Sequence, residues 1–261
     1  MSRTDRSPAA VPGDEAPASA PVSRESAPAN THAEVFALLA ELSRGGAVLD
    51  LPCGSGAFTR RLLAAGYRVT GGDVQAHPAV PVEVFRLADM NRPLPFEEGA
   101  FECVASIEGI EHIQRPFDFI RECHRVLAPG GVLLLTTPNI GSLRSRWRWF
   151  LTGFHNKCKH PLDETRPEPR HHINMCSYPE LRYMLHTSGF RLERVATNRV
   201  KPISWVYAPW VPLTWLVSAF FFAREVDGPE HRRVTDEVLR DMHSRAVLFG
   251  ETLILVARKG G

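Results

Sequence analysis

The chain has 261 residues, of which 44% are hydrophobic and 23% are charged. These fractions are normal for a soluble globular protein, and they exclude a wholly disordered or collagen-like chain; the length allows one large α/β domain or two small ones. The 31 Lys and Arg residues almost balance the 29 Asp and Glu residues, which gives a formal charge of +2. The chain as a whole is therefore not a nucleic-acid-coating protein, and any basic surface must be local.

The cysteines and the N-terminal sequence favour a cytoplasmic protein. The five cysteines are odd in number and include no CxxC pair, which indicates reduced thiols rather than a disulfide framework. No apolar segment follows Met1, so we expect no secretory signal. We expect a cytoplasmic location, with membrane association left open by an apolar segment near the C-terminus.

Residues 1–30 are rich in Ala, Pro and Ser and contain no aromatic residue. This composition buries too little apolar surface to offset the entropy of ordering, and it predicts a disordered tail. Beyond the tail, apolar residues recur at helical spacing: Val35, Leu38, Leu39 and Leu42. We expect the folded domain to span residues 31–261.

The next segment combines two strands, a glycine-rich turn and a helix. Residues 47–51 form a short apolar run, and Gly54 and Gly56 follow it directly. A second strand, residues 67–72, ends at Asp73. This order is typical of a βαβ nucleotide-binding unit, in which glycines let the ligand approach the backbone and the acid accepts hydrogen bonds from ribose hydroxyls.

The turn departs from one nucleotide-binding fingerprint and matches another. A dinucleotide fingerprint needs a third glycine at position 59, where this chain has Thr59. Instead an acid precedes the glycines, and Asp50-x-x-x-Gly54-x-Gly56 resembles motif I of the class I S-adenosylmethionine-dependent methyltransferases. The resemblance continues in register over residues 48–259. It implies an α/β fold with a Rossmann-like, seven-stranded sheet and helices on both faces.

The resemblance also implies a cofactor, S-adenosyl-L-methionine (SAM). In this family the glycine turn wraps the amino-acid half of SAM, Asp73 matches the residue that binds the ribose, and Asp89 matches the one that contacts the adenine amino group. The implied binding residues are Asp50, Pro52, Gly54, Ser55, Gly56, Asp73, Val74, Asp89, Met90 and Ile107. Each motif by itself also fits a generic βαβ turn in another doubly wound fold, and the joint spacing is what favours the methyltransferase.

The later elements are expected in the family's order: strand 4 at residues 101–107, a helix at 115–127, strand 5 at 132–137, strand 6 at 190–198 and strand 7 at 251–257. The turn Leu127-Ala128-Pro129-Gly130-Gly131, before strand 5, belongs to the same pattern.

Three ionisable residues follow strand 4 directly. Glu108, Glu111 and His112 share one face of a helical turn by their spacing, so their side chains are expected to converge. Carboxylates with an imidazole suit Mg²⁺ or Mn²⁺. This Glu-x-x-Glu-His element is similar to the metal-binding motif of small-RNA 2′-O-methyltransferases and of ubiquinone-pathway O-methyltransferases. In the RNA enzymes a later histidine completes the site, and His172 is the matching candidate here.

A metal-free reading of the same element stays open. Many members of the family carry a similar Glu-His element without a metal, and there the histidine packs or acts as a base near the acceptor. In both readings His112 and Glu111 are the candidate catalytic residues.

Residues 143–176 are expected to form a basic insertion after strand 5. Within residues 143–173, seven Lys and Arg residues face three Asp and Glu residues, and Trp147, Trp149 and Phe150 alternate with arginines. This composition suits stacking on bases, contact with a membrane surface, or simply a solvated lid over the acceptor pocket.

Residues 199–248 are expected to form a second insertion, between strands 6 and 7. Within it, residues 203–223 carry no charge and are long enough to span a bilayer. If both flanking strands belong to one sheet, the chain must return to its starting side, and Pro209 and Pro212 are expected to break a continuous helix. We therefore expect an apolar hairpin or lid that contacts a membrane surface, the acceptor or a second copy of the chain, followed by a helix with Val234, Val238 and Met242 on one face.

These features rank the functions. A basic aromatic lid beside an apolar insertion favours methyl transfer to a hydroxyl of a small or lipid-like acceptor. An RNA 3′-end 2′-O-methyltransferase would explain the lid but not the uncharged segment. A non-catalytic cofactor-binding scaffold is a third reading, and the intact motif residues count against it.

Overall fold

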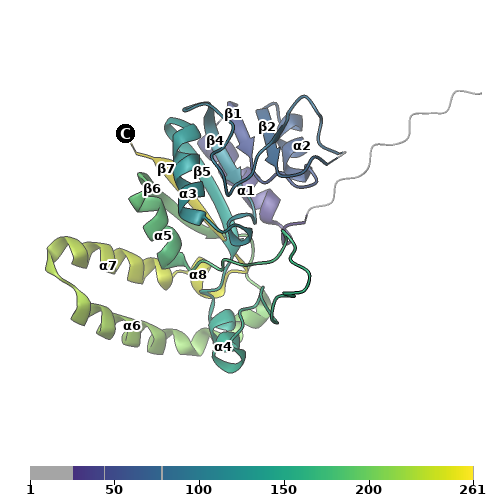
Figure 1. Ribbon diagram of the computed structural model, residues 1–261. Helices are drawn as coiled ribbons and strands as arrows, with labels where there is room; N and C mark the ends of the chain where they lie inside the picture. Colours follow the sequence, from purple (N-terminus) through teal and green to yellow (C-terminus); the bar gives the residue numbers. More distant parts are fainter. Residues whose placement is uncertain (1–25, 44, 78, 261) are drawn as a thin grey trace, which may run out of the picture.

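The computed structural model describes residues 26–260 except residues 44 and 78, and its centre is one twisted sheet (Figure 1). The seven strands lie in the order β3-β2-β1-β4-β5-β7-β6. They are β1 (Ala47–Asp50), β2 (Arg68–Asp73), β3 (Phe85–Leu87), β4 (Phe101–Ser106), β5 (Leu127–Pro138), β6 (Phe190–Thr197) and β7 (Thr252–Lys259). β7 runs antiparallel to both β5 and β6, and the other neighbours are parallel.

Helices cover both faces of this sheet. They are α1 (Thr31–Leu42), α2 (Ala57–Ala64), α3 (Pro116–Val126), α4 (Leu143–Thr152), α5 (Tyr178–Thr187), α6 (Val211–Glu225), α7 (Gly228–Met242) and α8 (Arg245–Phe249), with 3₁₀ turns η1 (Ile110–His112) and η2 (Pro202–Trp210). Two buried clusters divide along β5, because successive strand residues point to opposite faces: Leu133 and Leu135 pack with α3 and α5, while Val132 and Leu134 pack with α1 and α2. The expected α/β fold with helices on both faces is confirmed.

The folded domain is expected to begin at residue 31, and the first described helix, α1, begins at Thr31. The expected tail falls almost entirely on residues 1–25, which lie outside the described residues. Residues 26–30 are described, and Ala27 packs partly buried against the α1–α2 cluster. Asn198 in turn donates to the carbonyl oxygen of Ala29, at 3.0 Å. Tertiary contacts therefore reach a few residues before Thr31.

The basic insertion contains a helix, α4, that the sequence did not single out. Ser142 is its N-cap, and its hydroxyl accepts a hydrogen bond from the Ser145 amide. Gly153 ends the helix with a φ of 73°. Three arginines of this segment, Arg144, Arg146 and Arg148, therefore lie on one helix with Trp147, Trp149 and Phe150.

The prolines do not break the apolar insertion as expected. The 3₁₀ turn η2 contains Pro209 and continues directly into α6, where Pro212 lies in the first turn. A first-turn proline loses no intrahelical hydrogen bond, so it is tolerated there. The resulting run, Pro202–Glu225, is one helix long and apolar enough to cross a membrane, and none of its most apolar stretch is buried.

The hairpin itself is helical, and α6 and α7 extend together from the body of the molecule (Figure 1). Val238 and Met242 of α7 pack against the main core, as their spacing predicted, while Val234 is exposed. α6 has no buried residue. Since β6 and β7 are neighbours in the sheet, the chain returns to the side from which it left.

Candidate active site

The glycine turn between β1 and α2 has the backbone shape that its glycines allow. Gly54 and Gly56 have φ values of 51° and 75°, in the left-handed region that other residues avoid. The turn is tied to β2, since the Cys53 amide donates to the carbonyl oxygen of Gly72 at 2.8 Å. A Cβ on Gly56 would meet Val80 at 2.6 Å, whereas a Cβ on Gly54 would meet nothing within 4 Å. Gly54 therefore borders open space at the carboxyl edge of the sheet.

The two acids assigned to SAM lie at the ends of neighbouring strands. Asp73 ends β2 and accepts a hydrogen bond from the Gly54 amide at 2.9 Å. Asp89 follows β3 and accepts from the Asn91 amide at 2.9 Å. Because β2 and β3 are parallel, both carboxylates lie at the same sheet edge as the glycine turn.

Asp50 occupies a different position from the other motif residues. Only 1% exposed, it accepts a hydrogen bond from the Thr59 hydroxyl at 2.6 Å. Burial raises its pKa from 3.8 to about 7, although the bonds from Thr59 oppose the shift. The bond from Thr59 to Asp50 thus ties the first turn of α2 to the end of β1. Thr59 is the residue that stands where a dinucleotide fingerprint would need a glycine.

The remaining assigned residues line the same region with different exposure. Met90 and Ile107 are buried and Val74 is exposed, while Pro52 and Ser55 are half-buried. The close packing around this edge also involves Gly109, since a Cβ there would meet Pro52 at 2.5 Å.

Glu108 does not join the cluster that Glu111 and His112 form with His172. Its φ of 50° is left-handed, and its amide donates to the Thr136 hydroxyl at 3.0 Å. Burial raises the pKa of Glu108 to about 7, and nearby Lys157 opposes the shift. The predicted helical turn with Glu108, Glu111 and His112 on one face is wrong, because the turn starts only at Ile110 and Glu108 precedes it in a different backbone conformation.

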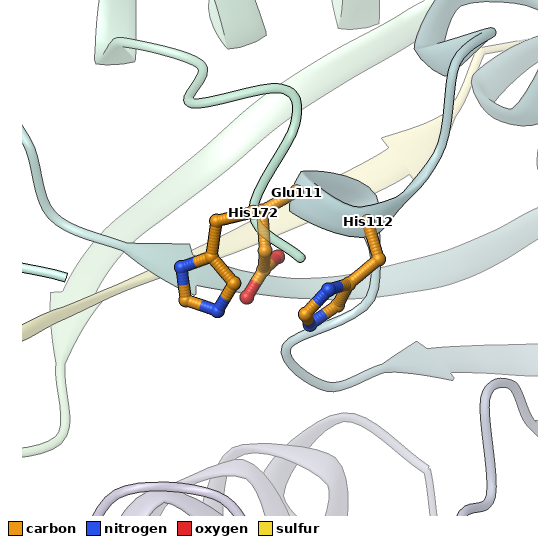
Figure 2. Close-up of side chains that lie close together, drawn as sticks. All are labelled: Glu111, His112 and His172. Atoms are coloured by element: carbon orange, nitrogen blue, oxygen red, sulfur yellow. The ribbon is translucent and has the colours of Figure 1, made fainter. Parts of the chain in front are cut away.

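Glu111, His112 and His172 do converge (Figure 2), with one ligand atom from each within 4.8 Å of the others. The two imidazoles meet edge to face with their centroids 4.8 Å apart, and the Glu111 carboxylate lies beside them. The Asn174 amide donates to the Glu111 carbonyl oxygen at 3.0 Å, which joins the histidine loop to η1. The loop histidine predicted from the sequence therefore reaches the element after β4.

The electrostatics of this cluster are those of buried groups. Burial, and then the Glu108 carboxylate, raises the pKa of Glu111 well above its usual range. Burial lowers the pKa of His112, and burial together with His112 lowers that of His172 to about 4. Both imidazoles are therefore neutral at neutral pH.

His112 has a defined tautomer. Its Nδ1 lies 3.1 Å from the carbonyl oxygen of His171, which can only accept, so Nδ1 carries the proton. Nε2 then presents a lone pair. This orientation suits either a general base or a metal ligand whose other nitrogen donates to a backbone carbonyl.

The cluster's donor set fits a divalent cation. One carboxylate and two imidazoles suit Mn²⁺, Fe²⁺ or Zn²⁺ better than Mg²⁺, which favours oxygen ligands. Oε1 of Glu111 and Nδ1 of His172 are buried, and among the described residues neither has a hydrogen-bond partner. Glu108 does not belong to this donor set.

Sequence reasoning missed several residues around the site. Thr137 donates to Oε2 of Glu111 at 3.2 Å, and Lys157 lies 3.8 Å from Glu251. The run Thr136-Thr137 at the end of a buried strand was a readable signal, since hydroxyls at that edge need polar partners. Nothing in the local sequence brings Lys157 to Glu251.

Comparisons with known proteins agree with this geometry. The family described as Methyltransferase domain matches residues 25–195, more than half of the chain. The chain belongs to the class I SAM-dependent methyltransferases. The sequence-based assignment of the family is therefore confirmed.

Curated relatives match part of the chain. A probable S-adenosylmethionine-dependent methyltransferase of Mycolicibacterium smegmatis is 30% identical over 171 residues, which cover 62% of this chain and 58% of the relative. A ubiquinone biosynthesis O-methyltransferase of Pseudomonas aeruginosa is 33% identical over 105 residues, covering 36% of this chain and 45% of the relative. The chain thus spans about half the length of the curated relatives it matches.

Solved structures show the same fold at low identity. A Burkholderia thailandensis 1,6-didemethyltoxoflavin-N1-methyltransferase with bound S-adenosylhomocysteine gives a TM-score of 0.53 at 15% identity, covering 89% of this chain and 80% of the other. A SAM-dependent methyltransferase from Archaeoglobus fulgidus gives 0.53 at 16% identity, covering 87% and 92%.

Proposed function

We propose that the protein transfers a methyl group from SAM to a hydroxyl of a small or lipid-like acceptor. When bound, SAM supplies an electrophilic methyl group on a sulfonium sulfur. The observation that carries the proposal is the oriented, neutral His112 imidazole at the carboxyl end of β4, beside the sheet edge that holds the glycine turn, Asp73 and Asp89.

The chain's own residues would divide the work. Asp73 and the glycine turn would hold the cofactor, and Asp89 would contact its adenine. His112 would accept the hydroxyl proton at Nε2 while the His171 carbonyl holds its Nδ1–H. Thr136 donates a hydrogen bond to Glu108, and Thr137 donates one to Glu111.

The test is methyl transfer from radiolabelled SAM into a whole-cell extract, divided into organic-soluble, RNA and protein fractions. Label in the organic fraction is expected. His112→Asn should lower the rate by about 10²–10⁴-fold while S-adenosylhomocysteine affinity stays unchanged, since only a proton acceptor is removed. Label confined to RNA would favour the 3′-end methyltransferase, and cofactor binding without transfer to any fraction would favour the scaffold.

A divalent cation on Glu111, His112 and His172 is a second possibility that the geometry favours. The buried, unpartnered atoms of Glu111 and His172 support it. Titration of the protein with Mn²⁺ or Zn²⁺ should show one site that His172→Ala abolishes and Glu108→Gln preserves, because only His172 belongs to the donor set. Turnover unaffected by EDTA, with no such site, would leave His112 as a base alone.

The acceptor's lipid-like character rests on an apolar surface formed by α4, η2 and α6. Its exposed members are Trp147, Trp149, Phe150, Leu151, Ile203, Trp205, Val206, Trp210, Leu213, Trp215, Leu216, Val217, Phe220 and Phe221. The rings of Trp147 and Trp210 lie 5.9 Å apart and join α4 to η2. Arg224 lies over the Phe220 ring at the far end. An in-plane membrane contact fits an aromatic face flanked by cations, and it would present an amphiphile from the bilayer.

A further inference from the structure

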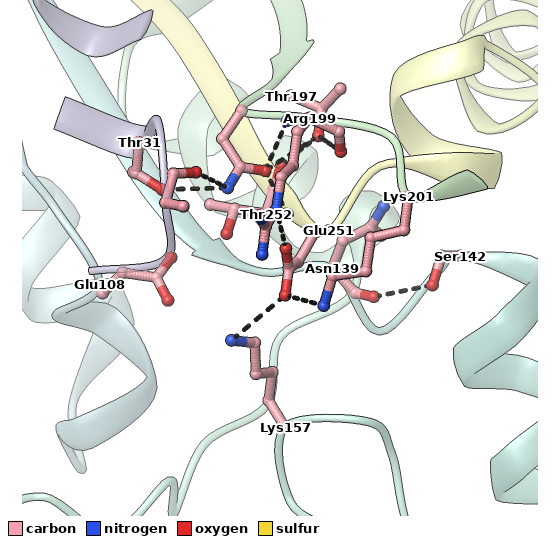
Figure 3. A network of polar contacts seen from close by, with 12 residues as sticks. Thr31, Glu108, Asn139, Ser142, Lys157, Thr197, Arg199, Lys201, Glu251 and Thr252 are labelled. Atoms are coloured by element: carbon pink, nitrogen blue, oxygen red, sulfur yellow. Dashed lines mark hydrogen bonds and ion pairs between the residues drawn. The ribbon is translucent and has the colours of Figure 1, made fainter. Parts of the chain in front are cut away.

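A polar cavity lies on the acceptor side of the sheet edge, apart from the SAM turn. Its volume is about 210 Å³, and it lies between the N-terminus of α4, the segment around Lys157 and Lys159, Lys201 before η2, and Glu251 before β7. Figure 3 shows Lys157 reaching toward Glu251, with Glu108 on the other side. The cavity is thus adjacent to the residues that follow β4.

The floor of the cavity is rigid. The Asn139 side-chain nitrogen lies within 3.1 Å of the carbonyl oxygens of Ala246, Val247 and Gly250, which fixes the turn before β7. That turn carries Glu251 into the cavity wall. The backbone that carries Glu251 is therefore fixed by hydrogen bonds to Asn139.

Positive charge exceeds negative charge in this cavity. Its lining has four cationic side chains, from Arg144, Lys157, Lys159 and Lys201, and one carboxylate, from Glu251. Glu251 also binds Arg199, at 2.5 Å, and Lys201, at 2.6 Å, so it is saturated by cations. Although burial raises its pKa, the hydrogen bonds from Arg199 and Lys201 hold the pKa of Glu251 below its usual range.

Two of the four cations have no acidic partner within the described part of the chain. Neither Arg144 nor Lys159 forms an ion pair there. The dipole of α4 adds partial positive charge at its N-terminus, where Ser142 and Arg144 line the cavity. Arginine, lysine and amide donors together favour a phosphoryl group over other anions.

The size and place of the cavity restrict its ligand. Pockets for whole drug-sized molecules measure about 300–1,000 Å³, so this one holds a headgroup rather than a complete acceptor. Arg144 shares α4 with the exposed Trp147, and Lys201 directly precedes η2, so the cavity opens where the apolar surface begins.

We infer that this cavity binds a phosphoryl group of the methyl acceptor, which makes the acceptor an anionic amphiphile. The cationic cavity takes the charged end and the apolar surface takes the hydrocarbon. The identification of the ligand as the methyl acceptor rests on the proposed function, but the binding of phosphate does not depend on methyl transfer.

The test measures binding of inorganic pyrophosphate to the full chain by calorimetry at physiological ionic strength. The double variant Arg144→Gln with Lys159→Gln should weaken binding by about tenfold or more for each lost charge-assisted hydrogen bond. The control, Arg166→Gln with Arg232→Gln, removes the same charge from exposed positions outside the cavity and should change binding less than about twofold. S-adenosylhomocysteine binding in each variant confirms that it is folded.

The outcomes separate the sources of the phosphoryl group. If pyrophosphate displaces the protein from phosphatidylcholine vesicles that contain phosphatidic acid, the ligand is a lipid headgroup. If pyrophosphate binds, but the protein binds vesicles with phosphatidic acid no more tightly than vesicles of phosphatidylcholine alone, the ligand is a soluble phosphorylated molecule. No pyrophosphate binding, or equal losses in both double variants, would overturn the inference. Absence of methyl transfer with pyrophosphate binding intact would count against the proposed function alone.

Discussion

At the scale of single residues, the SAM site depends on charged groups at the strand ends. Asp73 lies within 2.9 Å of the Gly54 amide, and it faces the open space beside the turn. Within the described structure only the amides of Gly54 and Gln75 bind its carboxylate, which leaves it able to accept from the ribose hydroxyls in the role that we propose for it.

Asp73→Asn is therefore expected to weaken S-adenosylhomocysteine binding by about 10–100-fold, the loss of hydrogen bonds to a charged acceptor. Calorimetric titration gives the affinity directly. Asp236→Asn, on the exposed side of α7, is the matched control and should bind as the unmodified protein does. Equal affinity in the two variants would remove Asp73 from the cofactor site.

Asp50 makes the stability of the protein depend on pH. Its pKa is about 7 in the folded state and 3.8 ordinarily, so the cost of burying its charge is absent below pH 4 and complete above pH 7. The free energy of unfolding contributed by this group falls as pH rises between these values, because the folded state then binds more protons than the unfolded state.

Asp50→Asn should abolish this dependence. Relative to the unmodified protein, the variant is expected to gain stability as pH rises from 4 to 7. The gain is about 1.4 kcal/mol for each pH unit at most, which amounts to a few kcal/mol over this range. Urea unfolding at several pH values measures the difference. Two parallel curves would show that Asp50 has an ordinary pKa in the folded protein.

At the scale of elements, the turn between β1 and α2 needs glycine for two separate reasons: a positive φ, and the approach of a ligand to the backbone. Gly54 and Gly228 both have positive φ, and a Cβ on either would meet nothing within 4 Å. The two positions therefore share the same backbone cost on substitution, about 1–2 kcal/mol, and they differ in whether a ligand approaches the backbone.

Gly54→Ala and Gly228→Ala should consequently lower the free energy of unfolding by similar amounts. Only Gly54→Ala is expected to weaken S-adenosylhomocysteine binding, by about tenfold or more for a displaced backbone contact. Thermal unfolding and calorimetry on the same samples test both statements. If both variants bind the cofactor equally well, the turn does not approach it.

At the scale of the whole molecule, the apolar surface of α4, η2 and α6 is the part of the protein that we propose contacts a membrane. All five tryptophans of the chain lie in α4, η2 and α6. Tryptophan emission therefore reports on this surface alone and should shift to shorter wavelength on vesicles that contain phosphatidic acid.

Phe220→Ser with Phe221→Ser should reduce vesicle binding by about tenfold or more, since each buried phenyl side chain contributes about 1.5–3 kcal/mol. Val82→Ser with Leu87→Ser removes exposed apolar side chains at a distant edge and should have no effect. Unchanged binding in the phenylalanine variant, together with a dimer in light scattering, would make this surface a contact between two copies of the chain.

The sequence by itself determined the family, the sheet and the glycine turn between β1 and α2. These follow from local patterns: glycines that permit positive φ, acids at strand ends, and apolar runs whose period selects strand or helix. Even the hairpin's position between β6 and β7 was readable, because both strands were recognisable. The expected proline break was wrong, since position within a helix, rather than the presence of proline, decides whether a hydrogen bond is lost.

Only the tertiary structure decided which side chains meet. His112 and the His171 carbonyl are 59 positions apart, and Glu108 stays outside the cluster although it is only three residues from Glu111. The cationic cavity unites the residue after β5, the start of α4, the segment around Lys157, the start of η2 and the residues before β7, which no local spacing relates. Such contacts depend on how the packed helices and strands bring distant loops to one edge of the sheet. The sequence identifies the residues of those loops, but it does not show which of them come into contact.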